Sequence, residues 1–214
     1  MMTLHGYWRS SASYRVRIAL NMKGAKYRYN PVNLVKGEQG GEAHLSRNAQ
    51  GYVPVLELED GTCLTQSLAI MDFLDASYDT PEFMPRNPIL RSKILSASLV
   101  IAADIAPIQN SSVLNYIKSE YDQSQDEAMT WARHWIGKGF AALEGIAAAR
   151  KTKYLYTDDA AFFEICLIPQ VYNARRFGLD ISAYPALSDI DNMCRALPAF
   201  KKALPENQID APKA

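Results

Sequence analysis

The sequence predicts an α/β part followed by an all-helical part. Within the first 80 residues, strand-like and helix-like stretches alternate, which is typical of a small mixed sheet with helices on its faces. Three prolines then interrupt the pattern between Pro81 and Pro88, and such a stretch favours an interdomain connection. Beyond residue 83 no stretch resembles a strand. We therefore expect one domain over 1–82, a linker over 83–89 and a second domain over 90–214.

The first part begins with a strand over Thr3–Tyr7, followed by a serine-rich corner and a helix. The apolar residues of this helix recur at helical spacing, and Gly24 is suited to end it. Apolar residues within Tyr27–Leu34 predict a second strand. The polar, glycine-bearing stretch Lys36–Gln50 predicts a loop with a short helix.

A hairpin and a helix complete this part. Val53–Glu59 alternates apolar and charged residues, and Asp60-Gly61 is a strong turn signal before a return strand over Thr62–Thr65. Apolar residues from Leu68 to Leu74 then predict a helix, with Ser67 as the expected N-cap.

Helical periodicity accounts for the whole second part. Pro107 is expected to stop or kink the first of its helices. The helices are expected over Leu90–Ile105, Ser112–Tyr121, Asp126–Lys151, Asp159–Phe177 and Ala186–Leu197.

The composition excludes several classes of function. The 214 residues include 23 basic and 23 acidic side chains, so neither a nucleic acid nor an anionic membrane is an expected partner. The sequence has no signal-like start and no long apolar span. Its three cysteines form no C-x-x-C motif, which argues against a disulfide framework, a zinc site and a dithiol redox centre. We expect a cytoplasmic enzyme without a metal.

The stretch Trp8–Leu20 is the first candidate for chemistry. Its corner carries Ser10, Ser11 and Ser13 where a strand gives way to a helix. Serine hydroxyls and unpaired N–H groups then converge at the positive end of the helix dipole, which stabilises a thiolate or another small anion. The alternative is that Ser10 or Ser13 serves only as an N-cap.

Two further motifs are suited to a peptide-like ligand. Gln66-Ser67 stands at another strand-to-helix junction, where it can bind a carboxylate, although capping alone is an alternative role for Ser67. Val53-Pro54 precedes a strand, and a cis peptide bond there would turn the Val53 backbone outward to pair with a ligand.

Arginines are the expected binders of an anionic substrate. Arg9 adjoins the serine corner, and Arg175-Arg176 lies in a late helix, so these side chains could clamp a dicarboxylate if they face one cleft. The alternative for each is an ordinary solvated or structural arginine. The three histidines show no metal-ligand spacing.

These motifs together resemble the zeta class of glutathione transferases, which includes maleylacetoacetate isomerases and bacterial maleylpyruvate isomerases. The similarity covers nearly the whole chain. It rests on five motifs in order: Arg9-Ser10-Ser11-x-Ser13-x-Arg15-Val16-Arg17-Ile18-Ala19-Leu20, Val53-Pro54, Gln66-Ser67-Leu68-Ala69-Ile70, Ile108-Gln109-Asn110-x-Ser112-Val113-Leu114 and Leu167-Ile168-Pro169-Gln170-Val171-x-Asn173-Ala174-x-Arg176-Phe177.

The resemblance implies a thioredoxin-like first domain, a helical second domain, a homodimer and a glutathione site. It assigns the glutathione sulfur to Ser10, with Ser11 and Ala12 beside it. Catalytic roles fall to Ser10, Ser11, Arg9 and Arg176. The remaining glutathione contacts that it implies are Gln39, Val53 and a cis Pro54 along the tripeptide, Gln66 and Ser67 at the γ-glutamyl end, and Asn110 and Ser112 from the second domain.

This chain departs from the family pattern at three places. Ala12 stands where relatives often have cysteine, which should not abolish isomerisation because the reacting thiol is that of glutathione. Ala161 stands where a capping Ser or Thr is usual, which predicts a loss of ~1 kcal/mol unless Asp158 or Asp159 caps the helix instead. Ala106 replaces a polar residue, and no arginine lies near Ser111, which favours maleylacetoacetate over maleylpyruvate as substrate.

The resulting hypothesis is a glutathione-dependent cis–trans isomerisation of maleylacetoacetate to fumarylacetoacetate, a step in aromatic amino-acid catabolism. A thiolate adds to the cis double bond, the resulting single bond rotates, and the thiolate leaves. Three alternatives stay open: a maleylpyruvate isomerase, a conjugating or dehalogenating glutathione transferase, and a non-catalytic glutathione-binding protein.

Overall fold

The computed structural model describes residues 1–213, and their contacts divide them into two compact units. The first unit comprises Met1–Glu82 together with Ala196–Ala214, and the second comprises Phe83–Arg195. The last nineteen residues thus pack with the first unit, although we expected them in the helical domain. The boundaries 1–82, 83–89 and 90–214 stay a prediction, but Phe83 is fully buried in the second unit and its carbonyl accepts the Phe162 N–H at 3.2 Å.

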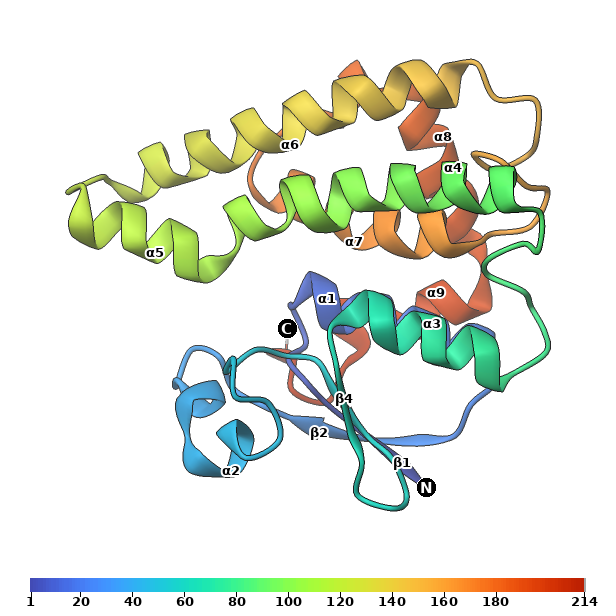
Figure 1. Ribbon diagram of the computed structural model, residues 1–214. Helices are drawn as coiled ribbons and strands as arrows, with labels where there is room; N and C mark the ends of the chain where they lie inside the picture. The colour runs from blue at the N-terminus through green and yellow to red at the C-terminus, as the bar shows by residue number, and fades with distance from the viewer. Residues whose placement is uncertain (214) are drawn as a thin grey trace. The chain divides into compact units, whose positions relative to one another are not determined.

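The first unit is built on a four-stranded sheet in the order β2-β1-β3-β4 (Figure 1). β1 (Met2–Gly6) runs parallel to β2 (Tyr27–Pro31) and antiparallel to β3 (Val55–Glu57), and β3 pairs with β4 (Cys63–Thr65). This is the thioredoxin-like arrangement that the resemblance implies. β2 ends at Pro31, three residues earlier than expected, and the Val32 N–H still donates to the Gly6 carbonyl at 2.7 Å.

Helices complete the first unit. α1 (Ser11–Met22) packs against α3 (Ser67–Ser77) and against α9 (Pro198–Ala203) from the end of the chain. Gly24 has a φ of 63° just beyond the C-cap of α1, which confirms the expected stop. The short helices are η1 (Glu38–Gly40) and α2 (Glu42–Leu45) after β2, and η5 (Pro205–Asn207) after α9.

The start of α3 corrects one expectation. Its N-cap is Gln66 with a φ of 65°, and Ser67 is the first helical residue. The Ser67 hydroxyl oxygen accepts a hydrogen bond from the buried side chain of Arg15 on α1, so a contact across the unit occupies the atom that we expected to cap the helix.

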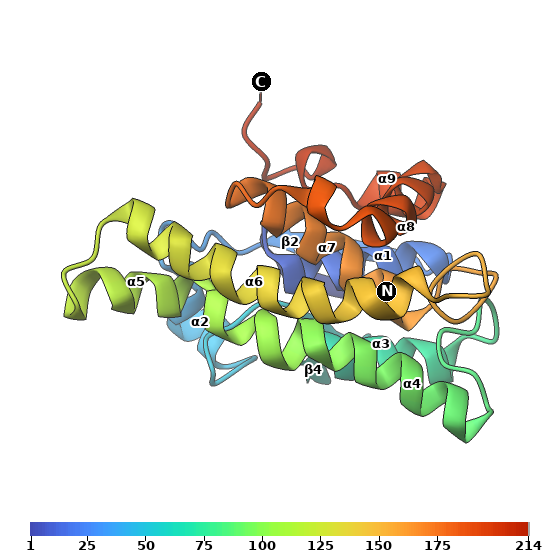
Figure 2. The same cartoon turned by 90° about the horizontal axis from the view of Figure 1, so that it is seen from above.

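The described residues of the second unit form helices and connecting loops without a strand, as predicted. α5 and α6 run side by side (Figure 2), and α4 packs against α7. The helices are α4 (Pro88–Leu99), the π-helical η2 (Val100–Ile105), η3 (Pro107–Gln109), α5 (Ser111–Glu120), α6 (Gln125–Ala148), α7 (Phe162–Arg176), η4 (Ile181–Ala183) and α8 (Pro185–Ala196).

Glu164 binds the backbone of Ala161, the N-cap of α7, although Ala161 has no side-chain oxygen that could accept a first-turn N–H. One of its carboxylate oxygens accepts the Ala161 N–H and the other accepts the Leu155 N–H, each at 3.0 Å. Neither Asp158 nor Asp159 caps this helix: the side chain of Asp158 accepts from the Lys153 N–H, and Asp159 is bonded through its carbonyl. The carboxylate of Glu164 is buried, and this burial raises its pKa to about 7.

Candidate functional site

The serine corner between β1 and α1 places one hydroxyl at the N-terminus of a helix. Ser10 is the N-cap, and its hydroxyl oxygen accepts the Ser13 N–H at 3.2 Å. The O–H of Ser10 is thereby left to donate, and acceptance at its oxygen polarises that bond. Ser13 is fully buried against Gly6 and contributes no exposed hydroxyl. Of the two serines considered as caps, Ser10 caps the helix and also keeps a donor for a ligand.

The first turn of α1 adds positive potential to this corner. The N–H groups of Ser11 and Ala12 make no hydrogen bond to any other described residue, as is usual for the first turn of a helix. Arg9 places its guanidinium over the Trp8 ring, 5.3 Å from the ring centre. Two N–H groups, a hydroxyl and a nearby cation are suited to stabilising a small anion.

Val53 lies beside this corner through a hydrophobic cluster. Val53 packs with Tyr7 and Val32, and Trp8 packs against the same cluster. The Val53–Pro54 peptide bond is cis, as predicted. Within the described residues, the Val53 N–H and carbonyl make no hydrogen bond, so both groups remain available to an extended ligand.

Gln66 and Ser67 form a second polar corner, at the start of α3. Gln66 donates from its side-chain amide to the Gln50 side chain at 2.9 Å, which fixes one orientation of the amide. Arg15 donates to the Ser67 hydroxyl oxygen at 2.8 Å, which leaves the Ser67 O–H to donate. This contact between α1 and α3 also holds the two polar corners at one fixed separation.

Gln39 stands on the segment that leads to Val53. The Gln39 carbonyl oxygen lies close to Gly51. A Cβ atom at position 51 would be only 3.2 Å from this oxygen. The Gln39 side-chain oxygen is buried and has no hydrogen-bond partner within the described residues. A buried acceptor of this kind is costly unless a ligand or water satisfies it, so it is suited to receiving an N–H of a bound peptide.

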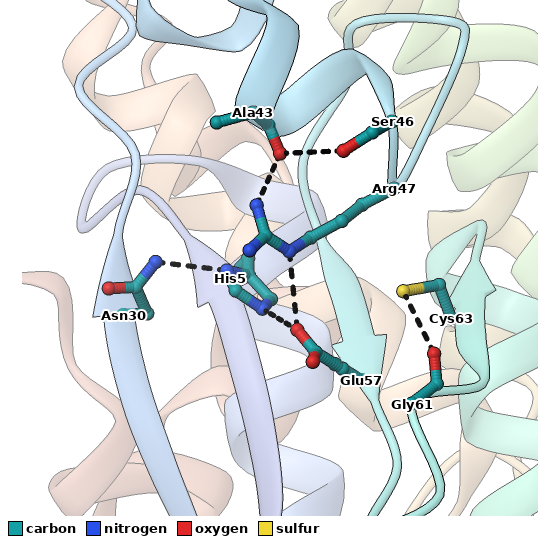
Figure 3. Close-up of polar contacts among 8 residues, drawn as sticks. All are labelled: His5, Asn30, Ala43, Ser46, Arg47, Glu57, Gly61 and Cys63. Carbon is teal, nitrogen blue, oxygen red and sulfur yellow. Dashed lines mark hydrogen bonds and ion pairs between the residues drawn. The ribbon is translucent and has the colours of Figure 1, made fainter.

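An ion-pair cluster ties the α2 segment to the sheet (Figure 3). Glu57 on β3 accepts from Arg47 at 3.2 Å and from the His5 Nε2 at 2.7 Å, while Asn30 donates to the His5 Nδ1 at 2.9 Å. Burial lowers the pKa of the His5 imidazole, and the hydrogen bond to Glu57 opposes that effect. Because Nδ1 accepts from an amide, the neutral tautomer that donates from Nε2 is favoured. This cluster braces the segment carrying Gln39.

Cys63 lies at the edge of the same region and is not part of a reactive site. Its thiol contacts the Gly61 carbonyl at 3.7 Å (Figure 3), and burial raises the thiol pKa. None of the three cysteines forms a disulfide within the described residues. No group of His, Cys, Asp or Glu side chains within the described residues could hold a metal ion. No helix in the described part of the chain is long and apolar enough to cross a membrane.

Asn110 and Ser112 lie together in the second unit. Asn110 is the N-cap of α5 and accepts the Val113 N–H at 3.0 Å, and Ser112 donates its hydroxyl to the same Asn110 oxygen at 2.6 Å. Capping therefore accounts for both side chains within their own unit. Their roles toward glutathione stay a prediction.

The two adjacent arginines of α7 differ in their surroundings. Arg175 forms an ion pair of 2.6 Å with Asp191, a carboxylate whose side chain is 1% exposed. Arg176 stacks on the Phe177 ring at 4.2 Å from the ring centre. Arg175 is thus a structural partner of a buried acid, and a role of Arg176 toward a substrate stays a prediction.

Ser10, Val53, Gln39 and the Gln66–Ser67 corner all belong to the first unit, and their common role toward a tripeptide stays a prediction. Sequence reasoning assigned no role to Arg15 or Gln50, which hold the second corner in place. The only sequence signal for Arg15 is its place in a helix with apolar neighbours, Tyr14, Val16 and Ile18, and the structure shows that its side chain is buried. Gln50 gave no signal, because its contact with Gln66 spans sixteen residues.

Comparison with known proteins places the chain in a family. Residues 1–76 match the family described as Glutathione S-transferase, N-terminal domain. The chain is 44% identical to a probable maleylacetoacetate isomerase of Vibrio cholerae over 98% of both proteins.

Solved structures agree with this result. A maleyl pyruvate isomerase, described as a bacterial glutathione S-transferase of the zeta class, matches with a TM-score of 0.95 at 34% identity, over 98% of this chain and 100% of that one. A maleylacetoacetate isomerase from Methylobacterium extorquens AM1 with bound malonate and GSH gives a TM-score of 0.95 at 32% identity, over 99% and 100%. The chain therefore belongs to the zeta class of glutathione transferases.

Proposed function

We propose that this chain catalyses the glutathione-dependent isomerisation of maleylacetoacetate to fumarylacetoacetate. The observation that carries the proposal is the Ser10 hydroxyl, which accepts the Ser13 N–H at the start of α1 and keeps its own proton to donate. The 44% identity to a probable maleylacetoacetate isomerase supports this substrate over maleylpyruvate, as does the lack of an arginine near Ser111.

The residues of the first unit fit a tripeptide. The unpartnered Gln39 oxygen and the unpaired Val53 backbone groups match peptide N–H and C=O groups, and the Gln66–Ser67 corner matches an α-carboxylate at a helix N-terminus. When bound, glutathione supplies a thiolate that adds reversibly to an activated cis double bond and so permits rotation about it. Because the thiolate leaves again, glutathione is not consumed.

The chain's own groups serve this chemistry by stabilising negative charge. A free thiol has a pKa near ~8.5, so the site must favour the thiolate at neutral pH. Ser10 donates to the sulfur, while the N–H groups of Ser11 and Ala12 stabilise the negative charge that develops on the substrate. We assign Arg9 and Arg176 to the substrate's carboxylates, a role consistent with the malonate bound in the solved relative.

The test compares maleylacetoacetate and maleylpyruvate, with and without glutathione, by following the loss of the cis enol absorbance. We expect turnover of maleylacetoacetate that requires glutathione, with glutathione recovered unchanged by mass spectrometry. A retained conjugate would instead indicate a conjugating transferase, and faster turnover of maleylpyruvate would reassign the substrate. Glutathione binding without turnover of either substrate would indicate a non-catalytic glutathione-binding protein.

Variants of Ser10 test the proposed mechanism. Ser10→Ala should lower kcat on the order of 100-fold, because one donor to the reacting centre is lost. Ser10→Thr, which keeps a hydroxyl, should retain a measurable part of the activity. Ser77→Ala, an exposed serine at the end of α3, serves as the control. Unchanged turnover by Ser10→Ala would remove Ser10 from the mechanism.

We also propose a cytoplasmic homodimer. The support for a dimer is a set of exposed apolar side chains on α4, namely Ile89, Leu95 and Leu99, of which Ile89 is 70% exposed. The lack of a disulfide among the described cysteines is consistent with a reducing compartment. Light scattering with size exclusion and cell fractionation would test the two proposals.

A further inference from the structure

Both backbone polar groups of Trp8 are held by charged side chains. The Trp8 N–H donates to the Asp210 carboxylate at 2.9 Å, and the Trp8 carbonyl accepts from the Arg17 guanidinium at 2.9 Å. Trp8 stands two residues before Ser10 and has left the β1 strand. The position of this backbone therefore depends on one side chain of the following helix and on one that lies 202 residues further along the chain.

Arg17 connects this backbone to the end of the chain. Its guanidinium is fully buried and donates to three carbonyls, those of Tyr7, Trp8 and Ala203. The Tyr7 carbonyl also accepts the Ser10 N–H at 3.0 Å. Arg17 thus contacts the same oxygen that anchors the catalytic serine's own backbone. A guanidinium stays charged at physiological pH, so these bonds persist.

Asp210 closes the arrangement from the C-terminal segment. The carboxylate oxygen that accepts the Trp8 N–H also accepts the Tyr29 hydroxyl at 3.3 Å. Burial raises the pKa of the Tyr29 phenol, so that group remains a donor. Asp210 thereby joins β2 to the corner that carries Ser10, and all of these residues belong to the first unit.

We propose that Asp210 is a positioning residue for the Ser10 hydroxyl, acting through the Trp8 backbone. This inference rests on the proposed role of Ser10 toward the glutathione sulfur. Without Asp210 the Trp8 amide loses its acceptor, and the turn between Tyr7 and Ser10 becomes free to shift. A displacement of about 1 Å at a reacting group can cost on the order of 100-fold in rate.

The experiment uses the full-length chain and three variants. Asp210→Ala removes the acceptor, Asp210→Asn keeps an acceptor oxygen without the charge, and Ile209→Ala alters a neighbouring side chain that is 78% exposed. For each variant, the pH dependence of thiolate absorbance gives the thiol pKa of bound glutathione. Steady-state rates give kcat and the KM for glutathione.

We expect Asp210→Ala to raise the thiol pKa and to lower kcat by about 10-fold, because Ser10 no longer donates in the best geometry. The KM for glutathione should change less than about 3-fold, since the Gln66–Ser67 corner is intact. Asp210→Asn and Ile209→Ala should stay within about 3-fold of the original chain in kcat, with an unchanged thiol pKa.

Several results would overturn the inference. One is a lower melting temperature for Asp210→Ala with an unchanged thiol pKa and kcat, since the residue would then be only structural. Another is a fall in the thiol pKa of both Asp210 variants, because the carboxylate would then act through its charge. If Asp210→Ala does not fold, Tyr29→Phe is used instead, because it removes the hydrogen bond from Tyr29 to Asp210. The proposal is contradicted if the thiol pKa of bound glutathione does not rise in Tyr29→Phe.

Ser10→Ala separates this inference from the proposed function. If Ser10→Ala leaves the thiol pKa of bound glutathione unchanged, the assignment of Ser10 itself fails. If Ser10→Ala raises that pKa and Asp210→Ala does not, only the positioning role of Asp210 is wrong.

Discussion

Arg15 and Ser67 are joined by a hydrogen bond of 2.8 Å, although 52 residues separate them in the sequence. The bond runs from the guanidinium on α1 to the hydroxyl oxygen of the first residue of α3. It therefore links the two polar corners of the first unit, and it leaves the Ser67 O–H group able to donate a hydrogen bond.

Replacement of Arg15 should weaken glutathione binding more than it slows the chemical step. Arg15→Met removes a hydrogen bond from a charged donor, which corresponds to about a 10-fold rise in the KM for glutathione, with a smaller change in kcat. Arg28→Met, an exposed arginine of β2, is the matched control. An unchanged KM in Arg15→Met, with folding verified by circular dichroism, would contradict the role.

Gln66 should show a conflict between stability and binding. Its φ of 65° is unfavourable for a residue with a side chain and is tolerated by glycine. Gln66→Ala and Gln66→Gly both lose the ligand contact, so both should bind glutathione less tightly in calorimetry. In urea denaturation, the free energy of unfolding of the glycine variant should exceed that of the alanine variant by about 1 kcal/mol. Equal stability of the pair would show that this backbone is unstrained.

The two arginines at the end of α7 should separate stability from activity. Arg175→Met leaves the buried Asp191 with only Arg195, at 4.0 Å, and should destabilise the protein by about 3 kcal/mol. Arg176→Met should instead raise the KM for the maleyl substrate by about 10-fold, with little change in urea stability. The opposite assignment of these effects would mean that Arg175 contacts the substrate.

Glu164 should make stability fall as the pH rises. Its pKa is raised by burial from an ordinary value of 4.5 to about 7, so the folded state holds this proton more tightly than the unfolded state does. The stabilisation is complete below pH 4.5 and is lost as the pH rises through about 7. The total is on the order of 3 kcal/mol.

Urea denaturation across this pH range tests the role of Glu164, with Glu164→Gln as the variant. Glutamine does not titrate, so the stability of this variant should change less with pH, although glutamine keeps only one of the two oxygens that accept the Ala161 and Leu155 N–H groups. Parallel curves for the two proteins would assign the pH dependence to another group.

Local rules sufficed where an element depends on its neighbours in sequence. Ser10 as an N-cap, Gly24 as a helix stop and the Asp60-Gly61 turn all follow from short-range preferences, and the structure has each of them. The start of α3 could not be placed by the same rules. There the buried side chain of Arg15 occupies the Ser67 hydroxyl, and Gln66 adopts the unusual backbone instead.

Contacts between distant segments could not be predicted either, because local sequence preferences carry no information about them. No periodicity links Asp210 to Trp8, which are 202 residues apart, and none links Arg17 to Ala203. The cap of α7 was expected from Asp158 or Asp159, whereas the carboxylate three residues inside the helix reaches back to Ala161. Local sequence gives the residue types in such cases, and tertiary packing selects which of them meet.

The return of residues 196–214 to the first unit bears on how the chain matures during translation. Arg17 and Trp8 emerge from the ribosome early, but their partners Ala203 and Asp210 are synthesised only after every residue of the helical unit. The nascent first unit therefore cannot complete its packing until the second unit has been synthesised. Until then the Arg17 guanidinium lacks one of its acceptors, the Ala203 carbonyl. Completion of the Ser10 corner is in this sense a late event in biosynthesis, and chaperone binding to stalled nascent chains would be expected to persist up to that point.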